Sequence, residues 1–291
     1  MNTSYPPPVD KLLTYGDCRN FRDWPDYLAL GFTREHVDDL IRMATSEELN
    51  WGDSDSLAVW APVHAWRVLG QLRAAAAIAP LINFFKYVEP DDQWAPLELP
   101  QILGMIGPAA IPVLAEILLN PANKMYPRTY AGDSLCEIGK WHPEFREACV
   151  KQLTAAIKQA ENNHPSLNGF ILANLLDLKA VEAAPEIERA FVAEAIDPTI
   201  AGDWEDVQIE FALLEARKTR PTYSVFDSIS EDDDWDEGEE DEMTGGEESQ
   251  NEVIAPLFHN NRKKRDAAKA KNKKAMAKKS RRQNRKKKKK K

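Results

Sequence analysis

The feature that most constrains this chain is an eleven-residue segment that occurs twice. The segment from Trp60-Ala61-Pro62 to Leu69-Gly70 recurs 34 positions later, from Trp94-Ala95-Pro96 to Leu103-Gly104. Tryptophan, alanine, proline, leucine and glycine match in register. A period of roughly 20–50 residues is typical of repeat architectures, in which each unit buries its apolar face only against its neighbours. The sequence therefore predicts a protein built from stacked repeat units.

Prolines extend the pattern to four units. One proline stands near the expected start of the first helix of each unit, and another near the start of the second: Pro62, Pro96, Pro127 and Pro165, then Pro80, Pro112, Pro143 and Pro185. Proline suits the first helical turn, where its missing N–H would have no intrahelical partner. A leucine and a small residue follow each first proline, as Leu69-Gly70, Leu103-Gly104, Leu135-Cys136 and Leu172-Ala173. The small residue is expected to let the paired helix approach closely, and Pro100 predicts a kink or a broken turn inside a first helix.

Four regions are expected along the chain. Residues 1–54 form an N-terminal helical cap, and residues 55–220 contain the repeats and a C-terminal capping helix. That helix is predicted over about 203–217, capped by Asp203, with Trp204, Glu205, Asp206 and Glu210 facing solvent. Alternating strand patterns are nearly absent from residues 1–220, so the fold class is all-α. Residues 221–261 are predicted to be an acidic disordered linker and 262–291 a basic disordered tail.

The repeat motif resembles a known family. Val68-Leu69-Gly70-Gln71-Leu72, followed by Ala77-Ile78-Ala79-Pro80-Leu81, is similar to the HEAT-like repeat, particularly the variety named after phycobilisome lyases. The second unit repeats this pattern from Ile102 to Leu114. The resemblance covers roughly residues 55–200 and implies an α–α superhelix of the HEAT/ARM solenoid type, with about four to five helix pairs. The segments Leu13-Thr14-Tyr15-Gly16-Asp17 and Trp24-Pro25-Asp26-Tyr27 also resemble an uncharacterised group of bacterial HEAT-type proteins.

The charges fall into three blocks. Residues 1–226 carry a net charge of −13, residues 227–252 carry −14, and residues 262–291 carry +18, with 19 lysines and arginines and one acid. Such a tail binds polyanions through counterion release and without sequence specificity. The tail residues expected to do so are Arg262, Lys263, Lys264, Arg265, Lys273, Lys274, Lys278, Lys279, Arg281, Arg282 and Arg285. RNA, ribosome or DNA is the expected polyanion, with an acidic protein as the alternative partner. A tail that only aids solubility, or that pairs with the chain's own acidic stretch, is the other interpretation.

No catalytic signature stands out in the sequence. The HExxH, GxSxG, GxxxxGK[ST] and GxGxxG patterns are absent, and the five histidines are scattered. Cys18, Cys136 and Cys149 have no CxxC spacing and are expected to be buried thiols in a reducing compartment. His64 is expected to be structural or on the surface, with a position lining a groove as the alternative. We therefore expect no metal, no cofactor and no enzymatic activity.

The tryptophans separate into two groups. Trp60 and Trp94 recur at equivalent places and are expected to pack between units, together with the structural residues Pro62, Leu69, Gly70, Pro96, Leu103 and Gly104. Trp51, Trp66, Trp141 and Trp204 are less determined by the pattern, and one or two are expected to be exposed as binding anchors.

These patterns favour a non-enzymatic scaffold or adaptor that binds a protein partner on its concave face while the tail contacts a polyanion. A nucleic-acid- or ribosome-associated factor acting through the tail is one alternative. A chromophore-attachment protein similar to bilin lyases is the other, and it rests on the resemblance alone. No segment is long and apolar enough to predict a membrane span. A cytoplasmic location is expected, and the oligomeric state stays open.

Overall fold

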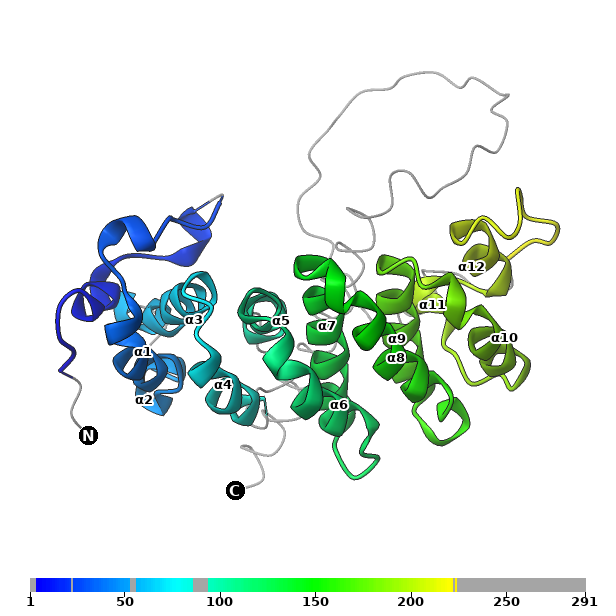
Figure 1. The fold of residues 1–291 in the computed structure, drawn as a ribbon, viewed down its shortest axis with the longest axis horizontal. Coiled ribbons are helices and arrows are strands. Elements are labelled where there is room, and N and C mark those ends of the chain that lie inside the picture. The colour runs from blue at the N-terminus through cyan, green and yellow to red at the C-terminus, as the bar shows by residue number, and fades with distance from the viewer. Residues whose placement is uncertain (1–3, 22, 53–55, 86–93, 222, 224–291) are drawn as a thin grey trace, which may run out of the picture.

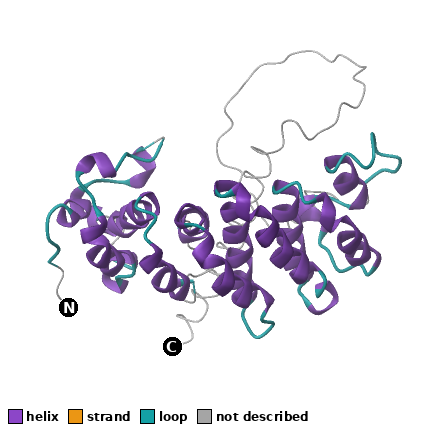
Figure 2. Ribbon diagram, viewed as in Figure 1, coloured by secondary structure: helices purple, strands orange, loops and turns teal. Residues whose placement is uncertain are grey.

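The computed structural model describes residues 4–21, 23–52, 56–85, 94–221 and 223. Every regular element within these ranges is helical and none is a strand, which confirms the all-α prediction (Figure 1, Figure 2). The α-helices are α1 (Val37–Ala44), α2 (Glu47–Asn50), α3 (Ala61–Gln71), α4 (Ile78–Phe84), α5 (Ala95–Ile106), α6 (Ile111–Leu119), α7 (Met125–Trp141), α8 (Arg146–Ile157), α9 (Pro165–Asp177), α10 (Ala184–Val192), α11 (Pro198–Ala201) and α12 (Trp204–Glu210). Short 3-10 helices are η1 (Val9–Thr14), η2 (Cys18–Asn20), η3 (Leu28–Leu30), η4 (Arg34–His36), η5 (Leu57–Trp60), η6 (Ala75–Ala77), η7 (Pro108–Ala110), η8 (Pro143–Phe145), η9 (Ala160–Asn162) and η10 (Val181–Ala183).

The helices lie in a row along the long axis of the molecule, from α1 and α2 at one end to α12 at the other (Figure 1). Helices α3, α5, α7 and α9, here called the first helices, pack in succession. The second helices are α4, α6, α8 and α10. Of these, α6 packs against α7 and α8, and α8 also packs against α9 and α10. Most long-range packing therefore joins helices that are near neighbours in the chain.

Proline positions explain where these helices begin. Pro62, Pro96 and Pro165 lie at the first or second residue of their helices, and Pro127 is the third residue of α7. Among the second helices, Pro112 and Pro185 are second residues, Pro80 is the third residue of α4, and Pro143 opens η8 just before α8. The predicted helix starts are thus found in all four units.

The sequence predicts a kink or a broken turn at Pro100. Helix α5 continues through this residue from Ala95 to Ile106, so the turn is not broken. The proline ring is buried. Burial of the helix in the fold stabilises it enough to outweigh one lost backbone hydrogen bond.

The repeated glycines lie where first helices meet. A Cβ built on Gly104 of α5 would lie 2.7 Å from Cβ of Glu137 and 3.1 Å from its backbone carbon, and Glu137 belongs to α7. A Cβ on Gly70 of α3 would meet side-chain atoms of Ile102 at 3.2 Å and Met105 at 3.3 Å, both in α5. The close partner is therefore the first helix of the next unit, and the expectation that it would be the paired second helix is wrong. At Gly104 a Cβ would overlap Glu137, so glycine is required there, whereas at Gly70 a Cβ would press only on the ends of two flexible side chains.

The leucines of the repeated motif lie in the core. Leu69, Leu103, Leu135 and Leu172, at equivalent places in the four first helices, expose none of their surface. Cys18, Cys136 and Cys149 are free thiols and buried, as expected from their number and spacing.

The final helix is shorter than predicted. Asp203 caps it in a capping box, but α12 ends at Glu210 and not near residue 217. The reason lies in Ala212, which has a φ of +56°, so the backbone turns out of the helix. Asp206 is only 5% exposed, so the prediction that it faces solvent is wrong. The chain turns back, and Arg217 donates to Asp203 and Asp206 at 2.6 and 2.5 Å.

Four helices end in the same left-handed turn without glycine. Arg73, Lys179, Glu194 and Ala212 have φ between 50° and 56°. At each, the N–H of the next residue donates to a carbonyl five residues back, as Ala74 does to Leu69 at 3.0 Å and Ala180 to Leu175 at 2.9 Å. This is the Schellman arrangement, which satisfies carbonyls that the helix end leaves without partners.

Candidate functional site

A polar stripe on α3 holds the N-terminal segment in place. His64, Arg67 and Gln71 occur at spacings of three and four, which puts them on one face of the helix. Gln71 accepts from the N–H of Tyr27 at 2.9 Å and donates to the carbonyl of Pro25 at 2.8 Å. His64 and Arg67 are buried and Gln71 is half-buried, so α3 lies between the N-terminal segment and α5.

His64 is held as a neutral ring. Its Nε2 lies 2.9 Å from the carbonyl oxygen of Gly16, which can only accept, so Nε2 carries the proton. Nδ1 then accepts from the hydroxyl of Tyr27 at 2.6 Å. Burial lowers the pKa of His64 to about 4.

Cys18 lies beside His64, with Sγ 3.4 Å from Nε2. A catalytic thiolate needs a depressed pKa, which a cationic neighbour such as a protonated histidine commonly supplies. Here burial raises the pKa of the Cys18 thiol to about 12, and the neighbouring imidazole is neutral. The pair therefore packs the N-terminal segment onto α3 and is not an activated nucleophile.

Arg67 forms a buried ion pair across the junction of α3 and α5. Its Nη2 and Nε donate to the Glu98 carboxylate at 2.6 and 3.0 Å, and the two side chains are 4% and 9% exposed. The guanidinium also lies over the ring of Trp24, 5.0 Å from its centroid. Both charges are taken out of water, so removal of one would leave the other uncompensated.

The repeated tryptophans meet each other. The rings of Trp60 and Trp94 lie edge-to-face with centroids 5.0 Å apart. Arg19 lies over Trp60, 5.0 Å from the ring centroid. Both tryptophans are half-buried, which fits contact between the units that begin at α3 and α5.

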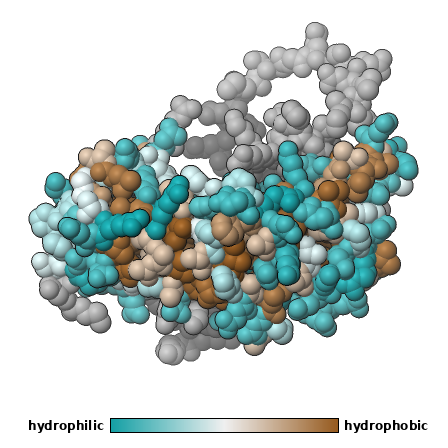
Figure 3. All heavy atoms as spheres, in the orientation of Figure 1, coloured by the Kyte–Doolittle hydropathy of each residue, from teal (hydrophilic) through white to brown (hydrophobic). Residues whose placement is uncertain are grey.

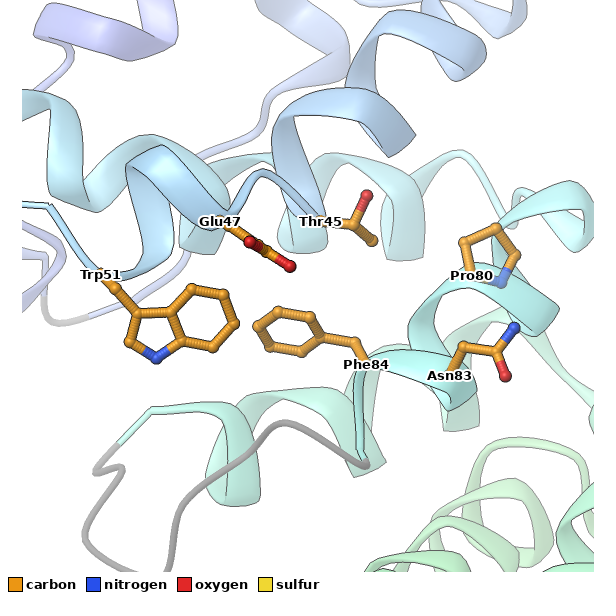
Figure 4. Close-up of a pocket in the computed structure, with 6 residues that line it drawn as sticks. All are labelled: Thr45, Glu47, Trp51, Pro80, Asn83 and Phe84. Carbon is orange, nitrogen blue, oxygen red and sulfur yellow. The ribbon is translucent and has the colours of Figure 1, made fainter. Parts of the chain in front are cut away.

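A surface pocket lies between the turn joining α1 to α2 and helix α4 (Figure 4). Its walls are Thr45, Glu47, Trp51, Pro80, Asn83 and Phe84, and its volume is about 240 Å³. The Trp51 and Phe84 rings lie next to one another, tilted by 34° with centroids 5.7 Å apart, and the Glu47 side chain extends over the same opening. Trp51 is 50% exposed although it is a large aromatic residue. An aromatic surface that is accessible and concave is typical of an anchoring site for a partner.

Only part of this pocket is visible in the sequence. Trp51 was among the tryptophans expected to include exposed anchors, and so was Trp141, which is also 50% exposed. Trp66 is 2% exposed and belongs to the core. No sequence pattern marks Phe84, Pro80 or Glu47 as site residues, because only the packing of α4 against the α1–α2 turn brings them to Trp51. Elsewhere, apolar side chains surface at several separate places between polar ones on the face seen in Figure 3.

The remaining sequence predictions concern metal binding, membrane spans and the charged C-terminal residues. The described ranges contain no group of three or more His, Cys, Asp or Glu side chains arranged to hold a metal ion. No single helix among the described elements is long and apolar enough to cross a membrane; α5 with η7–α6 is apolar enough together but is bent by 111°. The predicted linker beyond Tyr223 and all eleven polyanion-binding residues of the tail lie outside the described residues.

Comparison with known proteins returned nothing: no family model, no curated protein and no solved structure matches this chain.

Proposed function

We propose that this chain is a non-enzymatic scaffold, an α-solenoid of HEAT-like repeats whose concave face holds a protein partner. The succession of first helices that pack through Gly70 and Gly104 supports the repeat architecture. Such rows present extended surfaces made of several units, which suits protein binding.

The observation that carries this function is the pocket formed by Trp51 and Phe84. A large aromatic side chain that stays half exposed loses apolar stabilisation in the free protein. A partner side chain that enters the pocket would recover that stabilisation, and Trp is among the residue types enriched at binding hot spots. The pocket is small, and one side chain would fill it. Part of its wall is formed by α4, which is one of the second helices.

The test compares partners recovered by three forms of the full chain. The three forms are the natural chain, Trp51→Ala and Trp141→Ala. Each is purified from cells that produce it, and the proteins that copurify with it are quantified by mass spectrometry. Trp141 is the matched control because it has the same exposed fraction as Trp51 and lies in α7, away from the pocket. A partner recovered by the natural chain and by Trp141→Ala, but depleted with Trp51→Ala, supports the proposal. Equal recovery by all three overturns the pocket's role.

We propose further that the basic tail contacts a polyanion, an inference supported by its net charge of +18. Binding to a labelled poly(U) RNA should weaken steeply with added salt, because each neutralised phosphate contributes roughly −0.7 to the logarithmic slope. A variant with glutamine at the eleven named tail positions keeps the chain length and should lose most of this affinity. Binding that is insensitive to salt, or that survives in this variant, contradicts the tail's role.

No observation specifically favours the bilin-lyase alternative. A cysteine able to carry a chromophore has to be accessible, and Cys18, Cys136 and Cys149 are buried.

A further inference from the structure

Three arginines in the N-terminal part of the protein share one arrangement. Each lies over an aromatic ring and pairs with a carboxylate: Arg19 with Trp60 and Asp17, Arg42 with Tyr5 and Asp39, and Arg67 with Trp24 and Glu98. The guanidinium carbons lie 3.9 to 5.0 Å from the ring centroids. This fold thus combines aromatic ring, carboxylate and arginine in each of these places.

The Trp51 pocket contains two of these three components. Trp51 and Phe84 supply the rings, tilted by 34° to each other, and Glu47 supplies the carboxylate. The six lining residues include no base. Among the ion pairs of the described residues, none involves Glu47. Within the part of the chain that the structure describes, the component not found at this pocket is the cation.

We propose that the pocket binds an arginine side chain of a protein partner, completing this arrangement between two molecules. The inference rests on the proposed role in protein binding and adds the chemistry of the anchor. The occupant's guanidinium would lie against the half-exposed ring of Trp51, beside the edge that the buried Phe84 contributes to the wall, and donate to the Glu47 carboxylate. Its methylene stem would pack along Pro80.

Arginine fits these walls better than the other side chains that could enter. Its planar group stacks on aromatic faces, pairs with a carboxylate through two donors, and is more weakly hydrated than the lysine ammonium. An apolar side chain would cover the rings but would leave Glu47 partly desolvated without a partner, which costs free energy. The sign of the local charge agrees, because α2 carries Glu47 and Glu48 and no base.

The test uses the full chain with ¹⁵N-labelled tryptophan indoles, and Trp51→Ala and Trp141→Ala assign the two exposed signals. The probes are a blocked pentapeptide of glycine and serine with arginine at its centre, and the same peptide with citrulline, which has the same shape and no charge. Arginine peptide at millimolar concentration should shift the Trp51 indole signal and leave that of Trp141 in place. The citrulline peptide should need a concentration roughly three to ten times higher than the arginine peptide to give the same shift. Equal shifts with both peptides, or no shift at Trp51, overturn the proposal.

Glu47→Gln is the second variant, since it keeps the side-chain size and removes the charge at an exposed position. It should remove most of the preference for arginine over citrulline while the Trp51 signal still responds. An unchanged preference contradicts the role of Glu47. The acidic residues 227–252 also attract arginine, but they are the same in every variant and cannot produce a difference between them.

Two further outcomes separate this inference from the proposed function. If Glu47→Gln recovers the cellular partner as well as the natural chain does, while Trp51→Ala loses it, the pocket binds a partner but not through arginine. A Trp51 signal that responds to arginine peptide only after residues 262–291 are removed would mean that the chain's own tail occupies the pocket, which contradicts a partner's arginine as the occupant.

Discussion

The two kinds of junction in this molecule are built differently. Residues 16–27 are joined to α3 by a buried polar network around His64, Arg67 and Gln71. Helices α5 and α7 are joined by close contact at Gly104, and the Gly104 carbonyl also accepts from Nε2 of His142, the residue after α7, at 3.1 Å. A polar network forms only if several residues far apart in sequence have matching hydrogen-bond donors and acceptors, whereas a close contact requires one small residue. A polar network therefore specifies the one segment that can pack there, whereas a close contact at a small residue can be repeated between successive first helices.

The largest expected effect concerns the ion pair of Arg67. Glu98→Ala should destabilise the fold by about 3–5 kcal/mol, because it leaves a buried guanidinium without its counter-charge. Denaturant unfolding followed by circular dichroism measures this loss. The double variant Arg67→Met with Glu98→Leu should be much closer to the natural chain, since both charges are removed together. A loss below about 1 kcal/mol for Glu98→Ala would mean that water reaches this pair.

Lowering the pH should weaken the polar junction specifically. The pKa of His64 is lowered to about 4 in the folded protein, against 6.5 for an unperturbed histidine, so the unfolded chain binds the extra proton more readily. Stability contributed by neutral His64 is therefore complete above about pH 6.5 and is lost as the pH falls toward 4. The loss amounts to about 3 kcal/mol, from the size of this shift.

The measurement is denaturant unfolding at a series of pH values between 7 and 4. His64→Gln provides the control, because it has no proton to gain in this range and its stability should change less with pH. An identical pH dependence in both chains would show that other groups are responsible.

The glycine junction should respond to one added methyl group. Gly104→Ala should destabilise by about 1–2 kcal/mol, since overpacking against Glu137 exceeds the gain in helix propensity. Gly70→Ala is the matched comparison and should be nearly neutral, because its nearest atoms are the ends of the flexible Ile102 and Met105 side chains. Thermal unfolding of the two variants side by side measures the difference. Equal melting temperatures would mean that α5 and α7 separate at little cost.

The smallest global effect is expected at the C-terminal end, where a polar junction again fixes a terminal segment. Arg217→Gln removes a charge that binds Asp203 and Asp206, and the arginine side chain is 21% exposed. Solvent screening limits the loss of global stability to about 1 kcal/mol. Amide hydrogen exchange should increase in residues 203–217 and stay unchanged in α3 and α5. Increased exchange throughout the row would show that the end and the middle unfold together.

The difference between the junctions explains what the sequence could predict. Repeated glycines and prolines are visible because the same local requirement recurs, so Pro62, Pro96 and Gly104 indicated helix starts and contacts. The network of Gly16, Tyr27 and His64 occurs once and joins residues up to 48 positions apart, so no period reveals it. The pocket is harder still, since Trp51 and Phe84 meet only through packing between α1–α2 and α4. The end of α12 was missed because Ala212 adopts a backbone conformation that its type does not favour.

The four left-handed turns at Arg73, Lys179, Glu194 and Ala212 bear on how this surface can change over time. A side chain in this conformation costs about 1 kcal/mol in the folded state, yet glycine would cost a comparable amount by making the unfolded chain more flexible. The two terms nearly cancel, and hydrogen bonds to the preceding helix set the turn. These turns therefore tolerate basic, acidic or small side chains while each helix still ends at the same residue. The charge at the helix ends can vary without a change in how the helices pack.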